Sequence, residues 1–157
     1  MEHTISVLVE NKPGVLARIS GLFSARGYNI TSLAVGETDD PSVSRMTMVV
    51  DAPSEKILEQ ILKQLHRLID TVAVDDFTKK DYIGRELILV KVGCSKEDRP
   101  TIKKLLEKYH AKIDEKKEET IVVEASLEVK QINGLLEKLK PFGIKELVRT
   151  GRIAIVR

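Results

Sequence analysis

The sequence predicts an α+β protein in which one order of elements, βαββαβ, occurs twice in 157 residues. Two observations lead to this prediction. Apolar residues alternate with polar ones in some segments, as in a strand with one buried face, and recur every three or four residues in others, as in an amphipathic helix. Segments of the two kinds follow one another in the same order in residues 1–76 and 85–157.

The first half begins with a strand over residues 4–9, in which Ile5, Val7 and Val9 alternate with smaller or polar residues. A helix should follow, because Pro13 is suited to a first helical turn and Gly27 to the left-handed residue that closes a helix. Its apolar face consists of Val15, Leu16, Ile19, Leu22 and Phe23. The remaining elements are a strand over 29–36, a turn at 39–42, a strand over 44–50, a helix from Pro53-Ser54 with Ile57, Leu58, Ile61, Leu62 and Leu65 inward, and a strand over 69–74.

The second half repeats this order. Ser95 and Asp98 have the spacing of a helix N-cap signature. The elements are a strand over 87–92, a helix with Ile102, Leu105, Leu106 and Tyr109 inward, strands over 111–113 and 120–125 around a polar turn at 115–118, a helix with Ile132, Leu135, Leu136 and Leu139 inward, and strands over 144–148 and 153–156 separated by Gly151. Each half therefore predicts a ferredoxin-like sandwich, an antiparallel sheet with two helices on one face.

The charge distribution supports a division into two domains. The total net charge is only +2, whereas residues 1–76 carry −4 and residues 77–157 carry +6. The polar junction at residues 75–81 predicts domains at 1–76 and 85–157 joined by a linker at 77–84. A near-zero total argues against nucleic acid as the partner. An RNA-recognition module has the same topology but needs aromatic residues on its central strands, and the expected strands contain none.

The sequence lacks the residue patterns of several common active and metal sites. The single cysteine, Cys94, allows no intrachain disulfide and is interpreted as a small half-buried residue. His3, His66 and His110 are far apart in sequence, so no metal site is expected, and no glycine-rich phosphate loop or nucleophile motif occurs. The sequence therefore predicts no catalytic site. The absence of a long apolar run and of a signal-peptide pattern leads us to expect a cytoplasmic protein without a membrane partner.

One local motif is informative. The segment Val9-Glu10-Asn11-Lys12-Pro13-Gly14-Val15-Leu16 joins the first strand to the first helix. The first amides of a helix have no intrahelical acceptor and attract anions, and a glycine lets a ligand approach the backbone. Asn11 offers a polar side chain, and Val15 and Leu16 offer an apolar wall, so the turn suits a free amino acid. An ordinary strand-to-helix turn, with Asn as the cap, remains the alternative.

The motif also resembles the ligand turn of ACT domains, ferredoxin-like modules that bind amino acids. The resemblance extends over nearly the whole chain to the small regulatory subunits of acetolactate (acetohydroxyacid) synthase, and it is looser beyond about residue 95. The segments that carry it are Gly21-Leu22-Phe23-Ser24-Ala25-Arg26-Gly27-Tyr28-Asn29-Ile30, Thr38-Asp39-Asp40-Pro41, Ser44-Arg45-Met46-Thr47, Glu59 to His66 and Arg85 to Val92.

This resemblance implies a function. Such subunits bind a large catalytic subunit that uses thiamine diphosphate, FAD and Mg²⁺, and they bring no cofactor of their own. They stimulate it and make it sensitive to valine or another branched-chain amino acid. They form homodimers through their ACT domains, with the effector at the interface. Carried over by position, Asn11, Gly14, Val15 and Leu16 would bind the effector from one protomer, and Asn29 and Ile30 from the other.

Three expectations complete the prediction. The second half has the turn Gly93-Cys94-Ser95-Lys96-Glu97-Asp98 in place of the motif, so we expect the effector site in the first half only. One alternative function is a stand-alone ACT-type amino-acid sensor that regulates another partner. A second is a small ferredoxin-like enzyme, which would need a cluster of perturbed ionisable groups that the sequence does not display.

Overall fold

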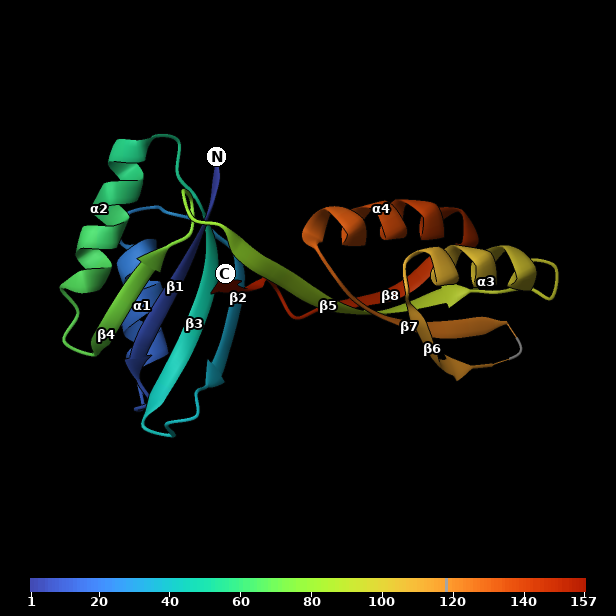
Figure 1. Cartoon of the computed structure of the whole chain (residues 1–157), viewed down its shortest axis with the longest axis horizontal. Coiled ribbons are helices and arrows are strands. Elements are labelled where there is room, and N and C mark those ends of the chain that lie inside the picture. Colours follow the sequence, from blue (N-terminus) through green and yellow to red (C-terminus); the bar gives the residue numbers. More distant parts are fainter. Residues whose placement is uncertain (118) are drawn as a thin grey trace. The chain divides into compact units, whose positions relative to one another are not determined.

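The computed structural model describes residues 1–117 and 119–157 and divides them into two compact units (Figure 1). The first unit comprises Met1–Ile83 together with Arg152–Arg157, and the second comprises Gly84–Gly151. Each unit contains an antiparallel sheet with two helices on one face, which confirms the predicted fold class. Glu118, at the end of the expected turn at 115–118, lies outside the described residues.

The first unit has the predicted βαββαβ order. Its elements are β1 (Glu2–Glu10), α1 (Val15–Ser24), β2 (Ile30–Glu37), β3 (Val43–Asp51), α2 (Glu55–His66) and β4 (Thr71–Asp76). The strand order across the sheet is β2-β3-β1-β4, so β2 and β4 are the outer strands. Gly27, with a φ of 68°, follows the last turn of α1 as the sequence predicted. The helix α2 begins after Ser54, whose hydroxyl accepts from the Ile57 N–H.

The core of the first unit lies between the sheet and its helices. The register of the strands determines which side chains reach this core. Ile5 of β1 and Leu33 of β2 both pair with Met48 of β3, so these three side chains lie on the same face of the sheet. The same face carries Val7, Val9, Met46 and Val50, and the helices contribute Val15, Ile19, Leu22, Phe23, Leu58, Ile61 and Leu65. This core fixes the point at which β1 ends and α1 begins.

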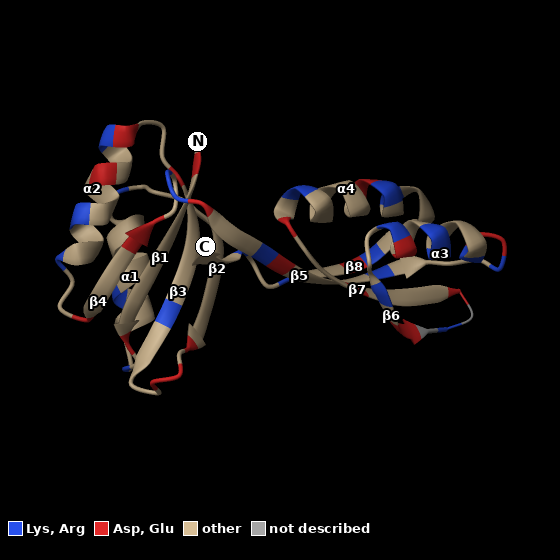
Figure 2. Cartoon of the chain, viewed as in Figure 1, with Lys and Arg blue, Asp and Glu red and all other residues tan. Residues whose placement is uncertain are grey.

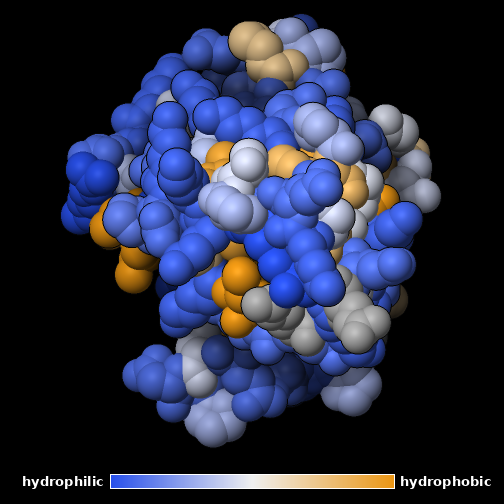
Figure 3. Space-filling view, turned by 90° about the vertical axis from the view of Figure 1, so that its right-hand side faces the viewer, coloured by the Kyte–Doolittle hydropathy of each residue, from blue (hydrophilic) through white to orange (hydrophobic). Residues whose placement is uncertain are grey.

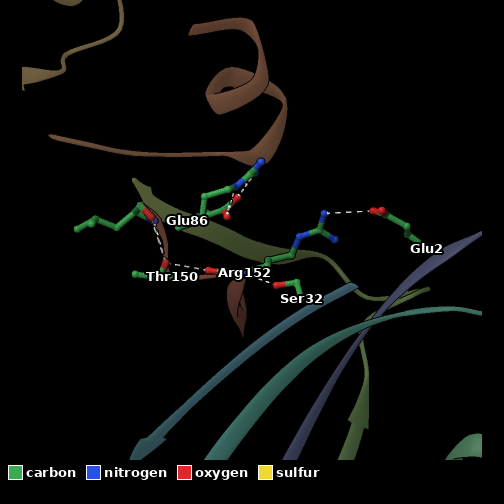
Figure 4. A network of polar contacts seen from close by, with 8 residues as sticks. Glu2, Ser32, Glu86, Thr150 and Arg152 are labelled. Carbon is green, nitrogen blue, oxygen red and sulfur yellow. Dashed lines mark hydrogen bonds and ion pairs between the residues drawn. The ribbon is translucent and has the colours of Figure 1, made fainter. Parts of the chain in front are cut away.

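Part of the outer face of the first sheet, around Thr4 and Ser32, is covered by Arg152. Thr4 and Ser32 flank Val49 in neighbouring strands. Arg152 donates from its backbone N–H to Ser32 Oγ (2.8 Å), as Figure 4 shows, and from Nη1 to Thr4 Oγ1 (2.7 Å). Thr4 and Val49 are consequently no more than 4% exposed. The strand β9 (Ile153–Val156) then pairs with β5, and the Arg157 N–H donates to the Asp81 carbonyl.

This division differs from the expected one in two places. Residues 153–156 were expected to complete the second domain, but they count with the first unit, because the hydroxyls of Thr4 and Ser32 bind Arg152. The expected linker at 77–84 is mostly part of the first unit. Phe77 is only 2% exposed and stacks on Tyr82, with ring centroids 5.3 Å apart. Apolar burial thus holds a segment whose charged neighbours led us to expect a linker.

The second unit is built from β5 (Tyr82–Gly93, of which residues 84–93 belong to it), α3 (Arg99–Lys108), β6 (Lys112–Lys116), β7 (Thr120–Leu127), α4 (Val129–Leu139), the short 3₁₀ helix η1 (Lys140–Phe142) and β8 (Ile144–Arg149). The strand order is β6-β7-β5-β8. Its core again lies under the helices, around Ile88, Val90, Val123, Ile132 and Leu135. Arg149 holds the buried Glu86 by two hydrogen bonds of 2.7 Å, also drawn in Figure 4.

The surface is rich in charge. Residues of both charges occur on α2, α3 and α4, and on α3 Lys and Arg outnumber Asp and Glu (Figure 2). On the face that Figure 3 presents, hydrophobic residues form small groups among hydrophilic ones. Among residues 1–117 and 119–157, no helix is long and apolar enough to cross a membrane.

Candidate functional site

The turn between β1 and α1 leaves the helix N-terminus open. Gly14 occupies the N-cap position with φ 85° and ψ −9°, a left-handed conformation that favours glycine. Among the described residues, no side chain caps this helix end. The Val15 N–H donates to the Lys12 carbonyl (3.4 Å), and among the described residues the N–H groups of Leu16 and Ala17 have no acceptor. These two amides carry partial positive charge, and a small anion can bind there.

Asn11 ties this turn to the hairpin between β2 and β3. Its backbone N–H donates to the Ser42 carbonyl (2.7 Å), and its Nδ2 donates to Glu37 Oε1 and to the Pro41 carbonyl (2.9 Å each). The sequence left open whether this amide would meet an ammonium or a carboxylate. Since Nδ2 is engaged with the protein, the side chain has its carbonyl oxygen left for a ligand, and a carbonyl oxygen binds an ammonium.

The hairpin turn that receives Asn11 is itself rigidly closed. Asp40 Oδ1 accepts from the Ser42 hydroxyl (2.7 Å) and from the Ser42 N–H (2.9 Å). These two hydrogen bonds, the one from the hydroxyl first, hold the pKa of Asp40 below its ordinary value. A carboxylate that is ionised at neutral pH therefore holds the turn whose Pro41 and Ser42 carbonyls accept from Asn11.

Val15 and Leu16 point in different directions. Val15 is 4% exposed and belongs to the core, whereas Leu16 is 47% exposed. The structure thus separates two residues that the sequence analysis placed together as an apolar wall. Val15 packs into the core of the first unit, and Leu16 is the exposed apolar side chain beside the helix end.

A charged pair that the sequence analysis missed lies beside Gly14. Arg18, in the first turn of α1, donates from Nε to Asp70 Oδ2 (2.7 Å) and from Nη2 to Asp70 Oδ1 (2.9 Å). The Asp70 side chain is only 9% exposed, and its hydrogen bonds with Arg18 lower its pKa although burial acts in the opposite direction. The Glu10 N–H also donates to the Asp70 carbonyl (2.9 Å). Fifty-two residues separate the partners, and no local spacing in the sequence signals the pair.

Asn29 and Ile30 lie at the other end of the first sheet. Ile30 pairs with Val50, whereas Glu37, which binds Asn11, pairs with Ser44. Val50 and Ser44 are six residue steps apart along β3, which corresponds to about 20 Å. One protomer therefore does not bring Asn29 or Ile30 to the turn. Asn29 is exposed immediately before β2.

In the corresponding turn of the second unit, Ser95 donates from its N–H (3.1 Å) and hydroxyl (2.6 Å) to Asp98 Oδ2, and Cys94 is buried in the core. The helix α3 begins only at Arg99, with Asp98 as its N-cap residue and no capping side chain among the described residues, so the predicted N-cap at Ser95 is wrong: the pair closes the turn before the helix. A hollow of about 770 Å³ adjoins this turn. Its lining mixes the cations Lys96, Arg99 and Lys145 with the acids Asp98 and Glu119.

A metal site was not expected, and within the described part of the chain no three His, Cys, Asp or Glu side chains are grouped so that they could hold an ion. Cys94 is a free thiol inside the second core. His3 is buried in the first unit, where its Nδ1 lies 3.1 Å from Thr78 Oγ1.

Comparison with known proteins identifies the family. Residues 5–73 match the family described as the AHAS small subunit-like ACT domain, and residues 85–157 match the small subunit of acetolactate synthase. The acetolactate synthase small subunit of Bacillus subtilis is 42% identical over 100% of this chain and 91% of its own length. That of Mycobacterium leprae is 43% identical over 99% and 91%, respectively.

A solved structure agrees over the whole fold. The crystal structure of the acetolactate synthase small subunit from Thermotoga maritima superposes with a TM-score of 0.91 at 34% identity, covering 100% of this chain and 98% of that one. The predicted resemblance is thereby confirmed, and the turn at Gly14 lies in the part that matches an ACT domain. The chain belongs to the family of acetolactate synthase small subunits.

Proposed function

We propose that this chain regulates the catalytic large subunit of an acetolactate synthase by binding a branched-chain amino acid, with valine as the first candidate. The observation that carries the proposal is the open helix end at Gly14, flanked by the acceptor oxygen of Asn11 and the exposed side chain of Leu16. These groups match a carboxylate, an ammonium and an aliphatic side chain, respectively.

The site is completed by a second protomer. The strand β2 is the outer strand of the first sheet, so its outer edge is available for pairing. If two copies pair through β2 in antiparallel fashion about a two-fold axis, the start of one β2 lies beside the end of the other. The end of β2 is Glu37, which binds Asn11. The partner's Asn29 and the partner's Ile30 then reach the turn, which explains why one protomer keeps them about 20 Å away.

A ligand held between two protomers can act as a regulator. An effector shifts an equilibrium only by its difference in affinity for the two states, and a rotation at the dimer interface removes one side of such a site. A coupling free energy of about 1–3 kcal/mol changes activity by about 5–150-fold. The thiamine diphosphate, FAD and Mg²⁺ of the reaction would reside in the catalytic subunit, and this chain would contribute no reacting group.

The test is to mix the purified chain with the catalytic subunit of an acetolactate synthase and to assay pyruvate condensation with and without valine, leucine or isoleucine. We expect the chain to raise the activity and one of these amino acids to lower it again. Amino-acid binding without any effect on the synthase would favour a stand-alone sensor. Turnover by the isolated chain would favour an enzyme. Either result would overturn the proposal.

A further inference from the structure

Arg18 has a side chain that is half exposed and yet fixed in direction. Its side chain is 49% exposed, and its Nε and Nη2 are both bonded to the Asp70 carboxylate, which is almost buried. An exposed arginine ordinarily samples many rotamers, whereas two parallel hydrogen bonds to a carboxylate fix the plane of the guanidinium. The fold therefore holds one exposed cation in a defined orientation.

The remaining nitrogen of Arg18 faces the turn. Its Nη1 lies 3.2 Å from the point where a side chain at residue 14 would begin. Because Gly14 has no such side chain, the guanidinium and the open helix end border the same space. A guanidinium has five N–H donors and Asp70 uses two of them. Among the described residues, no hydrogen-bond acceptor is bonded to Nη1.

We propose that Arg18 is a ligand-binding residue of the amino-acid site, whose Nη1 edge binds the α-carboxylate of the ligand together with the first amides of α1. Asp70 is the positioning residue, since it acts on the ligand only by holding the guanidinium. This inference rests on the proposed function and deepens it. It assigns the carboxylate to Arg18 and the helix end, and it leaves the ammonium to Asn11.

Lys12 provides a matched control. It is a second cation of the same turn, its Nζ donates to Glu10 Oε2 (2.9 Å), and its side chain is 63% exposed. A general loss of positive charge near the site would affect both residues alike. A specific carboxylate contact depends on Arg18 and Asp70 only.

The experiment is calorimetric titration of the full-length chain with L-valine and with L-valinamide, which lacks the carboxylate. We expect the wild-type chain to prefer valine clearly. Arg18→Gln should weaken valine binding by about tenfold to a hundredfold, as for a lost hydrogen bond to a charged group, and change valinamide binding less than about twofold. Asp70→Asn should give the same pattern with a smaller loss, and Lys12→Gln should change neither ligand by more than about twofold.

The outcomes separate the two proposals. If the wild-type chain binds valine and Arg18→Gln keeps both its affinity and its preference over valinamide, the role of Arg18 is wrong and the proposed function stands. Equal weakening of both ligands would show a merely structural role and also overturn the inference. Should Arg18→Gln fail to fold, Arg18→Lys replaces it, with the same selective loss for valine expected. If the wild-type chain binds none of valine, leucine and isoleucine, the proposed function fails, and the role of Arg18 with it.

Discussion

The strand-to-helix turn that follows the first strand differs between the two units of this molecule. In the first unit, Gly14 leaves the helix end open, and an arginine fixed by a buried carboxylate borders it. In the second, Gly93 is packed so closely that a Cβ would lie 2.4 Å from the Phe142 carbonyl oxygen, and Ser95 and Asp98 satisfy one another. The two units share a fold, so the difference in chemistry comes from a few residues at one turn.

The outer faces of the two sheets differ as well. The first sheet buries small residues such as Thr4 and Val49 under Arg152. In the second sheet, the paired residues Leu89 and Val148 are 37% and 52% exposed. A sheet with helices on one face leaves its other face to be covered by something else, and in the first unit Arg152 covers part of that face.

The largest effect is expected for Gly14→Asp. The Cβ of the new side chain would lie 3.2 Å from Arg18 Nη1, so its carboxylate would pair with the guanidinium and occupy the place of the ligand carboxylate. We expect valine binding to weaken by at least about a hundredfold and inhibition to disappear, while the complex with the catalytic subunit still assembles. Calorimetry and the mixed assay measure this.

Gly14→Ala is the control for Gly14→Asp, because it introduces the strain of a left-handed residue without the charge, and it should weaken binding less. Inhibition of the Gly14→Asp complex at wild-type valine concentrations would place the effector site elsewhere. The hollow beside the second turn would then be the first place to look for it.

Gly93→Ala should have the largest effect on stability. Its Cβ would meet a backbone carbonyl at 2.4 Å, which the chain cannot relieve by a rotamer change. We expect a loss of about 2–3 kcal/mol in the free energy of unfolding, measured by urea denaturation. Gly21→Ala, inside α1 with no atom within 4 Å of its Cβ, should instead stabilise by about 0.5–1 kcal/mol. Equal effects of the two variants would contradict the close packing of the second turn.

Arg152→Ala tests the cover of the first sheet. It removes the donor to Thr4 Oγ1 and the ion pair with Glu2 from a largely buried side chain. We expect a loss of about 1–3 kcal/mol in the free energy of unfolding. Arg157→Ala, at the end of the same segment, breaks only an exposed pair with Asp81 and should cost about 0.5 kcal/mol or less. If both variants unfold like the wild type, the segment does not stabilise the first unit.

Asn29→Ala should weaken valine binding by about tenfold and leave the dimer intact, because a ligand contact is lost and the edge of β2 keeps its backbone groups. Calorimetry and sedimentation velocity measure the two properties. Unchanged affinity would argue against an effector site shared between protomers.

The smallest expected effect is on how the free energy of unfolding depends on pH. Since the folded-state pKa of Asp70 is lowered, the stability that its pair with Arg18 supplies is fully present above the pKa of an unfolded Asp, about 3.9. It is lost progressively as the pH falls below that value. Between pH 5 and about pH 3, the unfolding free energy of Asp70→Asn should therefore fall less steeply than that of the wild type. Parallel curves would mean that the pair contributes nothing to stability.

Much of the fold could be predicted because it depends on local patterns. A strand or helix with one buried face repeats its apolar residues at a fixed spacing. This spacing, seen in Ile5, Val7 and Val9 and in Ile19, Leu22 and Phe23, predicted the elements to within a few residues. The turn residues Asn11 and Gly14 could also be singled out, because glycine and asparagine have specific backbone and hydrogen-bonding properties.

The missed features depend on contacts between distant residues. The pair of Arg18 and Asp70 and the contact of Arg152 with Ser32 join segments 52 and 120 residues apart. Phe77 was assigned to a linker because its neighbours are charged, although one buried ring was enough to hold the segment. Val15 was assigned to the ligand wall because helical spacing gives a face but not its exact width.

The position of Arg152 in the sequence has a consequence for biosynthesis. The ribosome makes Arg152–Arg157 only after the whole of Gly84–Gly151, yet Arg152 covers part of the sheet that begins at Glu2. At about 5–20 residues per second, this part of the first sheet remains uncovered for several seconds of translation. The amino-terminal unit therefore makes its contacts with Arg152 only after the second unit has been synthesised.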